Sequence, residues 1–452
     1  MNRSPGANST LEGVLADVEA HYHARHPRSA AHQAQAARYM PGGNTRTVLH
    51  FSPFPLAWAR GTANRLSDVD GNTYLDFLGE YSAGLYGHSN PVIAEAMKSA
   101  IDDGTVLGGP NRFEADLASA ICKRFPSIEL LRFTNSGTEA NLLALSVVLA
   151  QRPGRSRVLA FKFAYHGSVL AFAQSNGPLN VPIDWLMGSY NDITGTEALI
   201  RTHASELAAV IVEPMQGGGG CIPATADFLR MLRRECTAHG ISLIFDEVMT
   251  SRLSPGGLQE VLGVSPDMTT LGKYLGGGAS FGAFGGSRAL MQCFDPTKPG
   301  TLAHAGTFNN NVMSMAGGLA GLTKVFTNEE CIRINRLGDQ LRTRINEAAN
   351  RTSVPLRATG VGSLVGIHFS RKQINAPEDA HAADKAVTHI RQELHKLMHL
   401  DMIDRGYYFA RRGFIALSLP MNDADVDGFI GALDEFLGSY GALIDRTLPA
   451  DC

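Results

Sequence analysis

Short apolar runs recur through the middle of the chain and alternate with amphipathic stretches. The runs at 157–161, 208–214 and 242–247 show no polar alternation, which is typical of strands buried on both faces. The stretch FLRMLRRECTAH between the last two predicts a helix, and Gly240 is placed to end it. This order predicts a parallel sheet covered by helices. In such sheets, ligands bind outside the carboxyl ends of the strands.

The two ends of the chain follow a different pattern. Residues 1–40 predict one or two helices, and Asp70-Gly71-Asn72 between two strand-like runs predicts a hairpin. A helix is expected to begin at Ser89-Asn90-Pro91. After about residue 330, helical stretches flank short strands. The helices are expected at 331–350, 378–400 and 424–440, and the strands in SLVGIHF and GFIALSLP.

Three parts are therefore expected. Residues 1–80 form an N-terminal segment of helices and a small sheet, which joins the smaller domain. Residues 81–330 form the large ligand-binding domain, and residues 331–452 form a small α+β domain.

Composition excludes several classes of protein. The 452 residues are 44% hydrophobic, with 40 basic and 43 acidic side chains, so no nucleic-acid partner is indicated. No apolar run approaches the roughly 20 residues of a membrane span, and no secretion signal precedes the first helix, so we expect a cytoplasmic protein without a membrane partner. The six cysteines form no C-x-x-C pair, so no metal site is expected.

The first candidate for chemistry is the run Thr134–Asn141, TNSGTEAN. A strand-like segment leads into small polar residues and then into a helix, so backbone N–H groups at the helix start are available to an anion. An ordinary Ser or Thr helix cap would produce part of the same pattern. Five small polar residues are more than a cap requires.

The second and third candidates are an acid and a lysine. Asp246 and Glu247 end an apolar strand, and their side chains are expected to point to opposite faces. Asp246 serves either as a charge partner for a ligand or as the cap of the next turn. Lys273 lies among apolar residues and glycines. Although most lysines are solvated, these surroundings suit a desolvated amine capable of Schiff-base chemistry.

One ligand satisfies all three candidates. It needs an anionic group, a basic ring nitrogen and a carbonyl carbon, and pyridoxal 5'-phosphate has each of these. The phosphate would lie on the turn at 136–138, the ring nitrogen would pair with Asp246, and Lys273 would bond to the carbonyl carbon. Glycines are unusually common, 48 in all, and they concentrate between Gly217 and Gly286, where backbone would approach the flat ring.

The sequence resembles the class III aminotransferases of fold type I, and within them the bacterial β-phenylalanine aminotransferases. It is also similar to the glutamate-1-semialdehyde aminomutases. The resemblance extends over about residues 38–420 and rests on PGG at 41–43, NSGTEAN at 135–141, YHG at 165–167, VEPMQG at 212–217, IFDEVMT at 244–250, LGKYLGGG at 271–278 and GTFNNN at 306–311. It implies an α/β fold with a large domain built on a mainly parallel seven-stranded sheet and a smaller α+β domain.

The resemblance also implies roles for individual residues. Lys273 would carry the cofactor and move the proton, with Asp246 on the ring nitrogen and Ser136, Gly137 and Thr138 on the phosphate. Tyr165 would stack on the ring beside His166, and Glu213 and Gln216 would orient the ring and the substrate. Thr307 would reach the phosphate of a neighbouring subunit, because active sites of the family lie at a homodimer interface.

Substrate recognition is expected from Arg46 and Arg412, since a guanidinium holds a carboxylate through two parallel hydrogen bonds. Val48, Phe51 and Tyr81 are candidates for an aromatic-tolerant wall, or else for plain core packing. Arg411 makes the choice of arginine ambiguous. The aminomutases have an acidic residue in the Arg411–Phe414 region, so the arginine here favours transfer between separate substrates.

The resemblance therefore implies an aminotransferase that moves the amino group of a β-amino acid to 2-oxoglutarate or pyruvate by a ping-pong mechanism. Alternatives are an aminomutase of the semialdehyde type, or an aminotransferase for a specialised biosynthetic intermediate. A scaffold protein without turnover and a dinucleotide oxidoreductase, the latter suggested by Gly276–Gly286 alone, are weaker alternatives.

Overall fold

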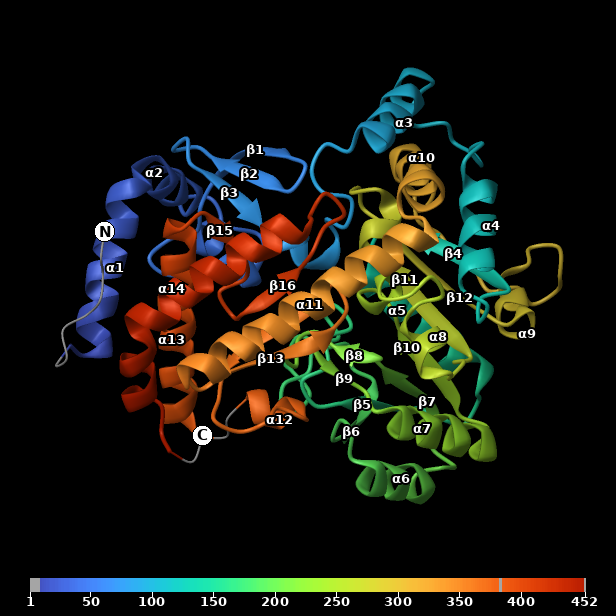
Figure 1. Ribbon diagram of the computed structural model, residues 1–452. Helices are drawn as coiled ribbons and strands as arrows, with labels where there is room; N and C mark the ends of the chain where they lie inside the picture. The colour runs from blue at the N-terminus through green and yellow to red at the C-terminus, as the bar shows by residue number, and fades with distance from the viewer. Residues whose placement is uncertain (1–8, 382–383, 451–452) are drawn as a thin grey trace. The chain divides into compact units, whose positions relative to one another are not determined.

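The computed structural model describes residues 9–381 and 384–450 (Figure 1). The chain divides into two compact units. The central unit comprises Ser82–Tyr86 and Asn90–Asn335, and the terminal unit comprises Met1–Tyr81, Gly87–Ser89 and Arg336–Cys452. The three-part division at residues 80 and 330 remains a proposal.

A seven-stranded sheet forms the middle of the central unit. Its strand order is β4-β12-β11-β10-β7-β5-β6, and β12 runs antiparallel to both of its neighbours while the other pairs are parallel. The strands are β4 (Leu130–Thr134), β5 (Arg157–Phe161), β6 (Asp184–Gly188), β7 (Leu207–Val212), β10 (Ser242–Asp246), β11 (Met268–Gly272) and β12 (Gly282–Gly286). The predicted α/β fold with a mainly parallel sheet is confirmed.

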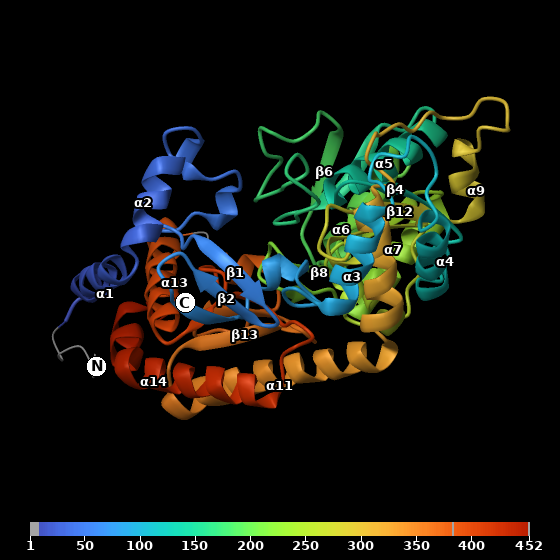
Figure 2. The same cartoon turned by 90° about the horizontal axis from the view of Figure 1, so that it is seen from above.

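Helices cover both faces of this sheet. Strands β7, β10 and β11 are buried along their whole length, as their continuous apolar sequences predict. Helix α5 (Gly137–Gln151) lies on one side of the strands and α7 (Ala226–His239) on the other (Figure 2). Helix α7 ends at Gly240, which has a left-handed backbone as predicted.

The remaining elements of the central unit are shorter. Helix α3 begins at the predicted position, where the Asn90 side chain accepts hydrogen bonds from the N–H groups of Val92 and Ile93. The helices are α3 (Pro91–Asp102), α4 (Glu114–Arg124), α6 (Ile193–Thr202), α8 (Leu258–Leu262), α9 (Arg288–Met291) and α10 (Val312–Ala320). Strands β8 (Met215–Gln216) and β9 (Ile222–Pro223) form a small hairpin. Single helical turns lie at η4 (Thr250–Arg252), η5 (Lys273–Gly276), η6 (Gln292–Phe294) and η7 (Gly321–Val325).

The terminal unit contains two small sheets. One has the order β1-β2-β3-β15 and includes the predicted hairpin, and the other is β13-β14-β16. The strands are β1 (Trp58–Thr62), β2 (Arg65–Asp68), β3 (Thr73–Asp76), β13 (Leu356–Val361), β14 (Leu364–Phe369), β15 (Tyr407–Tyr408) and β16 (Phe414–Ala416). Its helices are α1 (Leu11–Arg25), α2 (Pro27–Ala36), α12 (Pro377–Ala380), α13 (Lys385–Asp404) and α14 (Asp423–Thr447), and its turns are η1 (Pro41–Gly43) and η2 (Thr47–Leu49). The turn η3 (Gly79–Ser82) and helix α11 (Asn328–Thr352) each have residues in both units.

The helix expected over 378–400 is instead two helices, α12 and α13. The side chain of Asp384 accepts from the N–H groups of Ala386 and Val387, which starts a new helix at Lys385.

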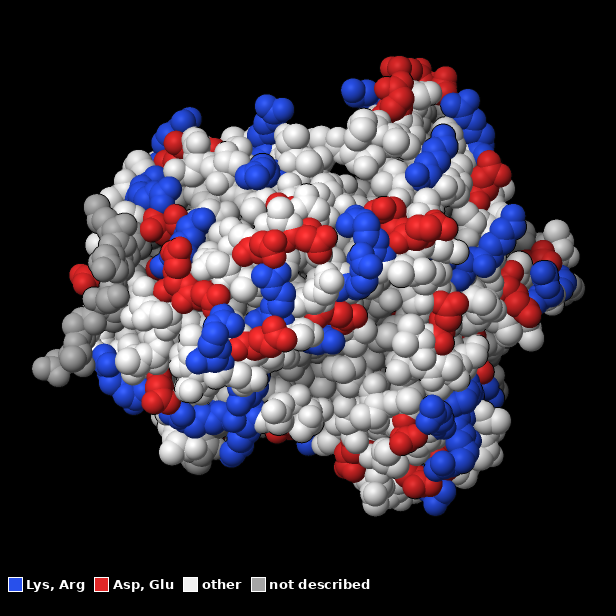
Figure 3. Space-filling model, in the orientation of Figure 1, with Lys and Arg blue, Asp and Glu red and all other residues white. Residues whose placement is uncertain are grey.

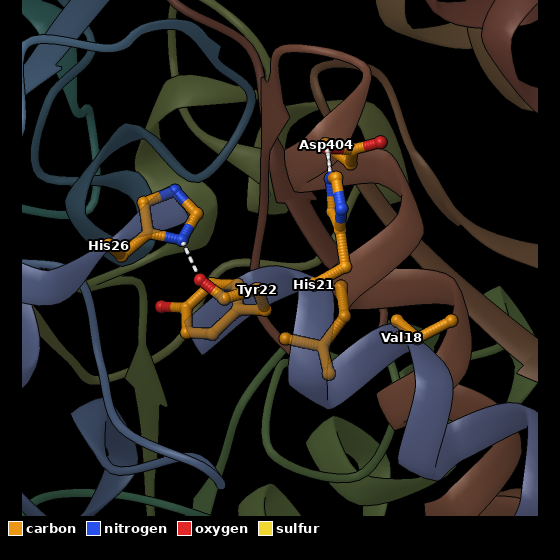
Figure 4. A pocket seen from close by; sticks show the side chains of 6 residues that line it. Val18, His21, Tyr22, His26 and Asp404 are labelled. Atoms are coloured by element: carbon orange, nitrogen blue, oxygen red, sulfur yellow. Dashed lines mark hydrogen bonds and ion pairs between the residues drawn. The ribbon is translucent and has the colours of Figure 1, made fainter. Parts of the chain in front are cut away.

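Helix α13 packs against α1. His21 on α1 lies 2.8 Å from the Asp404 carboxylate, and His26 lies 2.7 Å from the Tyr22 carbonyl oxygen (Figure 4).

Charged side chains of both signs are interspersed on the face seen in Figure 3, and no broad area of a single sign stands out there. None of the helices in the described part of the chain combines the length and the apolar character that a membrane span needs. Within residues 9–381 and 384–450, no group of three or more His, Cys, Asp or Glu side chains has the arrangement of a metal site.

Candidate active site

Three loops at the carboxyl ends of parallel strands meet around Val248. Strands β4 and β11 both run antiparallel to β12, so they share a direction with each other and with β10. A methyl group added to Gly137 would lie 2.9 Å from Val248 Cγ1, and one added to Gly272 would lie 3.1 Å from the same atom. The three sequence candidates are therefore brought together at one edge of the sheet, and the close approach of these segments favours glycine at both positions.

The turn between β4 and α5 forms an anion cradle. Ser136 caps α5, because its hydroxyl accepts the Glu139 N–H at 3.2 Å. The Glu139 carboxylate in turn accepts the Asn135 N–H at 2.7 Å. The N–H groups of Gly137 and Thr138 belong to the first helical turn and have no partner within the helix. Together with the positive end of the helix dipole, they suit a phosphate group.

Asp246 ends β10 and is buried. Its Oδ2 atom accepts from Asn141 Nδ2 and from His166 Nδ1, both at 2.8 Å, and its Oδ1 atom accepts the Val248 N–H at 3.0 Å. Since Oδ1 receives a single donor, it keeps the capacity to accept another N–H group. The carboxylate therefore caps the following turn, which is one of the two roles predicted for it. It also remains able to bind a ligand.

Glu247, the neighbouring acid, points away from Asp246 as predicted. Its carboxylate accepts from the Thr250 hydroxyl at 2.7 Å and from the N–H groups of Leu258 and Gln259. It is buried and satisfied in this way, so Glu247 holds the η4 and α8 segments rather than facing the candidate site.

Glu213 lies beside the YHG segment. Its two carboxylate oxygens accept the Tyr165 N–H at 3.0 Å and the Gly217 N–H at 3.2 Å. Burial raises the pKa of Glu213 from 4.5 to about 7; the nearby His166 opposes this shift and Asp246 adds to it. Glu213 thereby fixes the backbone of Tyr165.

Polar atoms with unused bonding capacity surround this part of the site. Gln216 Nε2 donates to the Lys162 carbonyl at 3.0 Å. Gln216 Oε1 and His166 Nε2 are buried and have no partner among the described residues. The Tyr165 side chain, by contrast, is 54% exposed. An exposed aromatic ring beside buried polar atoms fits a flat cofactor ring with polar substituents.

Lys273 follows β11 directly and begins the turn η5. Its Nζ atom donates to Ser82 Oγ at 3.1 Å, within the central unit. Its backbone is left-handed, with φ of 56°. Such a conformation costs a residue other than glycine about 1–2 kcal/mol, and strain of this kind gathers at functional sites.

The four candidate substrate residues gather in the terminal unit around the Tyr81 ring. The guanidinium carbons of Arg46 and Arg412 lie 5.7 and 5.6 Å from its centroid. The Phe414 ring stacks on Tyr81 at 5.6 Å. The Tyr81 hydroxyl donates to the Val48 carbonyl at 3.1 Å, so the backbone of Val48 takes part rather than its side chain. This group is called the arginine–tyrosine cluster below.

Arg411 and Arg412 have different contacts, and only Arg412 belongs to the arginine–tyrosine cluster. Arg411 Nη2 lies 3.8 Å from a carboxylate oxygen of Glu393 on α13. Arg412 is exposed, lies also over the Phe414 ring at 5.6 Å, and forms no ion pair among the described residues. Arg46 pairs with Glu80. Phe51, by contrast, is buried against Tyr22 and His399, so it belongs to the core.

Thr307 is exposed in the loop before α10. No hydrogen bond joins it to the other candidate residues in the part of the chain described here. The same loop is attached to the phosphate turn through Asn309, whose Oδ1 atom accepts from Asn135 Nδ2 at 3.0 Å. A role for Thr307 toward a neighbouring subunit remains a prediction.

Several residues of the site were not singled out from the sequence. Asn141 was part of the NSGTEAN motif, so its contact with Asp246 had a sequence signal. Phe414 likewise lay in the predicted strand GFIALSLP, and Ser82 directly follows the candidate Tyr81. Thr270, which bonds to Asn141 at 2.6 Å, lies in the strand MTTLG just before Lys273, and nothing in the sequence indicated this contact.

A mainly parallel sheet with a lysine, a buried aspartate and an anion cradle at one edge fits a pyridoxal-phosphate enzyme of fold type I. The model of the family Aminotransferase class-III matches residues 50–398, and the chain belongs to this family. It is therefore a pyridoxal-phosphate-dependent transaminase.

The chain is 47% identical to the β-phenylalanine transaminase of Variovorax paradoxus over 439 residues, covering 97% of this chain and 99% of the relative. The crystal structure of the Variovorax β-phenylalanine aminotransferase superposes with a TM-score of 0.93, covering 96% and 99% of the two chains. An ω-transaminase of Sphaerobacter thermophilus has 37% identity and a TM-score of 0.84, covering 92% and 97%. A glutamate-1-semialdehyde aminomutase of Pseudomonas aeruginosa shares the fold. It has 24% identity and a TM-score of 0.86, covering 95% and 98% of the two chains.

The raised pKa of Glu213 predicts a pH dependence of stability. The folded protein holds this proton up to about pH 7 and the unfolded chain releases it near 4.5, so the contribution of Glu213 to stability falls as the pH rises between these values. Burial lowers the pKa of His395 and of His399 to about 3, so these two groups contribute in the opposite direction. The full difference is on the order of 3 kcal/mol. Urea unfolding of the cofactor-free protein at about pH 5 and about pH 8 measures it. The stability difference between Glu213→Gln and the wild type, compared at the two pH values, isolates the contribution of Glu213; a difference that is the same at both pH values would contradict the assignment.

Proposed function

We propose that the enzyme transfers the amino group of an aromatic β-amino acid, such as β-phenylalanine, to 2-oxoglutarate or pyruvate. The arginine–tyrosine cluster is the observation that carries this proposal, because it offers two guanidinium groups beside stacked aromatic rings. The 47% identity to a β-phenylalanine transaminase supports the same substrate class. Donor and acceptor react in ping-pong order, the oxo product of the donor leaving before the acceptor binds.

Two arginines suit the two substrates. Donor and acceptor both carry carboxylates, and guanidinium binds a carboxylate through two parallel hydrogen bonds. Arg412 has no carboxylate partner of its own among the described residues. Arg46 pairs with Glu80, and both side chains are largely exposed, so a substrate carboxylate competes with Glu80 at modest cost. The faces of Tyr81 and Phe414 suit an aryl group.

The residues at the sheet edge fit the cofactor. Ser136, Gly137 and Thr138 would hold its phosphate, Asp246 Oδ1 would accept the N–H of its ring, and Tyr165 would lie against the ring face. His166 and Glu213 would fix Asp246 and Tyr165, and Gln216 Oε1 would face the ring substituents.

When bound, pyridoxal phosphate supplies an electron sink for the electrons released as the amino-bearing carbon loses its proton. Lys273 Nζ would take that proton and return it on the other side of the amino nitrogen, at the carbonyl carbon of the cofactor, acting first as base and then as acid in a 1,3-proton shift. Ser82 Oγ, at 3.1 Å, orients the amine for this task. The assignment of these roles, like a cytoplasmic location, is a proposal.

Lys273→Ala tests the role of the lysine. Borohydride reduction of the wild-type holoenzyme should add the mass of the reduced cofactor to the peptide that contains Lys273. The variant should show no such adduct and lose activity by at least about a thousandfold. Lys298→Ala is the control, since Lys298 is a half-exposed surface residue. An adduct on another lysine, or a variant that keeps turning over, would refute the role.

Variants of the two arginines test the substrate proposal. Arg46→Met and Arg412→Met should each raise KM about tenfold or more for a carboxylate substrate, since each removes a charged hydrogen-bonding partner, and should leave a simple aryl amine donor less affected. Arg411→Met is the matched control and should leave KM for the carboxylate substrate and KM for the aryl amine near their wild-type values.

The same assay, run with β-phenylalanine and with no 2-oxo acid, separates the proposed transfer from an aminomutase. Transfer requires the acceptor, whereas a mutase needs none. Equal effects at Arg411 and Arg412, or turnover without an acceptor, would contradict the proposal.

We also propose a homodimer with active sites at the interface. Val106, Leu107 and Phe308 are apolar side chains that are each more than half exposed. Their two loops are joined, because Asn111 Nδ2 donates to the Asn310 carbonyl at 2.7 Å and Asn310 Nδ2 donates to that of Gly109 at 3.2 Å. Exposed apolar residues beside the loop of Thr307 support a second copy as the partner.

Phe308→Asp tests the dimer, because it places a charge in the proposed interface. Light scattering should show a shift toward the monomer mass and weaker cofactor binding. Val261→Asp, at an apolar position that is 63% exposed on α8, should stay dimeric. A wild-type monomer would end the proposal.

A further inference from the structure

Asn141 and Thr270 form a buried chain of hydrogen bonds that ends on Asp246. We propose that both are positioning residues, which act through Asp246 on the ring of the cofactor and touch neither the cofactor nor the substrate. The inference rests on the proposed pairing of Asp246 with the ring nitrogen, and it names the residues that fix the geometry of that pairing.

The side-chain amide of Asn141 has all its hydrogen atoms in use. Nδ2 donates one to the His166 carbonyl and the other to Asp246 Oδ2, each at 2.8 Å. Oδ1 accepts the Thr270 hydroxyl at 2.6 Å. The reversed amide would direct its oxygen at a carbonyl and a carboxylate, which offer no hydrogen atom. The amide therefore has one possible orientation, and the Thr270 hydroxyl fills its remaining need.

The fold places the three side chains in contact. Asp246 and Thr270 are register partners on the parallel strands β10 and β11. Asn141 lies in the first half of α5, which packs across the same strands. Asn141 and Thr270 are at most 1% exposed, so water cannot replace either bond at low cost.

The consequence falls on the two oxygens of Asp246. Oδ2 receives Asn141 and His166, and Oδ1 receives the Val248 N–H alone. Fixing Oδ2 from two directions sets the plane of the carboxylate and leaves the open side of Oδ1 facing a ligand. Without Asn141 and Thr270, His166 is the remaining side chain that holds Oδ2, and the carboxylate gains freedom to rotate.

Thr270→Val tests the chain with little change in volume. In the holoenzyme it should weaken cofactor binding and lower kcat, each about tenfold, because a buried acceptor loses its donor. KM for the amino donor should change less than twofold. The visible absorbance of the bound cofactor should change its dependence on pH. Thr270→Ser keeps the hydroxyl and should restore all of these properties.

Thr269→Val is the matched control. Thr269 is the preceding residue of the same strand, is equally buried, and bonds to Ser127 Oγ at 3.0 Å away from Asp246. Its loss should affect thermal stability about as much as Thr270→Val does, while cofactor affinity and the absorbance titration stay near wild type. A merely structural role for Thr270 predicts that the two variants behave alike.

A double-mutant cycle tests whether Thr270 acts through Asn141. In the Asn141→Ala background, Thr270→Val should cost less than twofold in cofactor affinity, compared with about tenfold in the wild type. Full and additive losses, or a Thr270→Val enzyme with normal affinity and absorbance, would overturn the inference.

Asp246→Asn separates this inference from the proposed function beneath it. If that variant binds the cofactor normally and shows an unchanged absorbance titration, the pairing of Asp246 with the ring fails. If Asp246→Asn is impaired while the Asn141 and Thr270 variants are normal, the pairing stands and the positioning chain fails.

Discussion

A carboxylate buried at the end of a parallel strand is the constraint on which the candidate active site depends. Asp246 needs donors on every side that solvent does not reach, because an unsatisfied buried charge is costly. The structure supplies them from α5, from the YHG segment and from the turn after β10. Each donor comes from a different loop or helix, so satisfying one side chain brings these elements together.

The same constraint explains the packing of the surrounding backbone. Gly137 and Gly272 let two loops close on Val248, whose own N–H caps Asp246. Glycine is favoured at these places because a side chain would separate the loops. The glycine-rich region noted in the sequence therefore contributes to the approach of backbone segments, and Gly272 leads directly to Lys273.

Much of this could be predicted from the sequence. The strands at 157–161 and 242–247, the hairpin at Asp70-Gly71-Asn72 and the helix start at Asn90 depend on local pattern, and all of them are present. The break between α12 and α13 was missed because apolar spacing continues across it, while Asp384 starts the second helix. Thr270 could not be predicted, since its partner lies 129 residues away in the chain. The stacking of Arg46 and Arg412 on Tyr81 also depends on tertiary contacts; Glu80 and Tyr81 there have φ of 46° and 52°, a conformation that no local pattern indicates.

Asp246, held by its buried network, is proposed to pair with the ring nitrogen of the cofactor. Nitrogen NMR of the holoenzyme, loaded with cofactor labelled at the ring nitrogen, tests it directly. This nitrogen should be protonated in the wild-type enzyme at neutral pH, and the proton should be lost in Asp246→Asn. An unprotonated nitrogen in the wild type, or an unchanged signal in the variant, would contradict it.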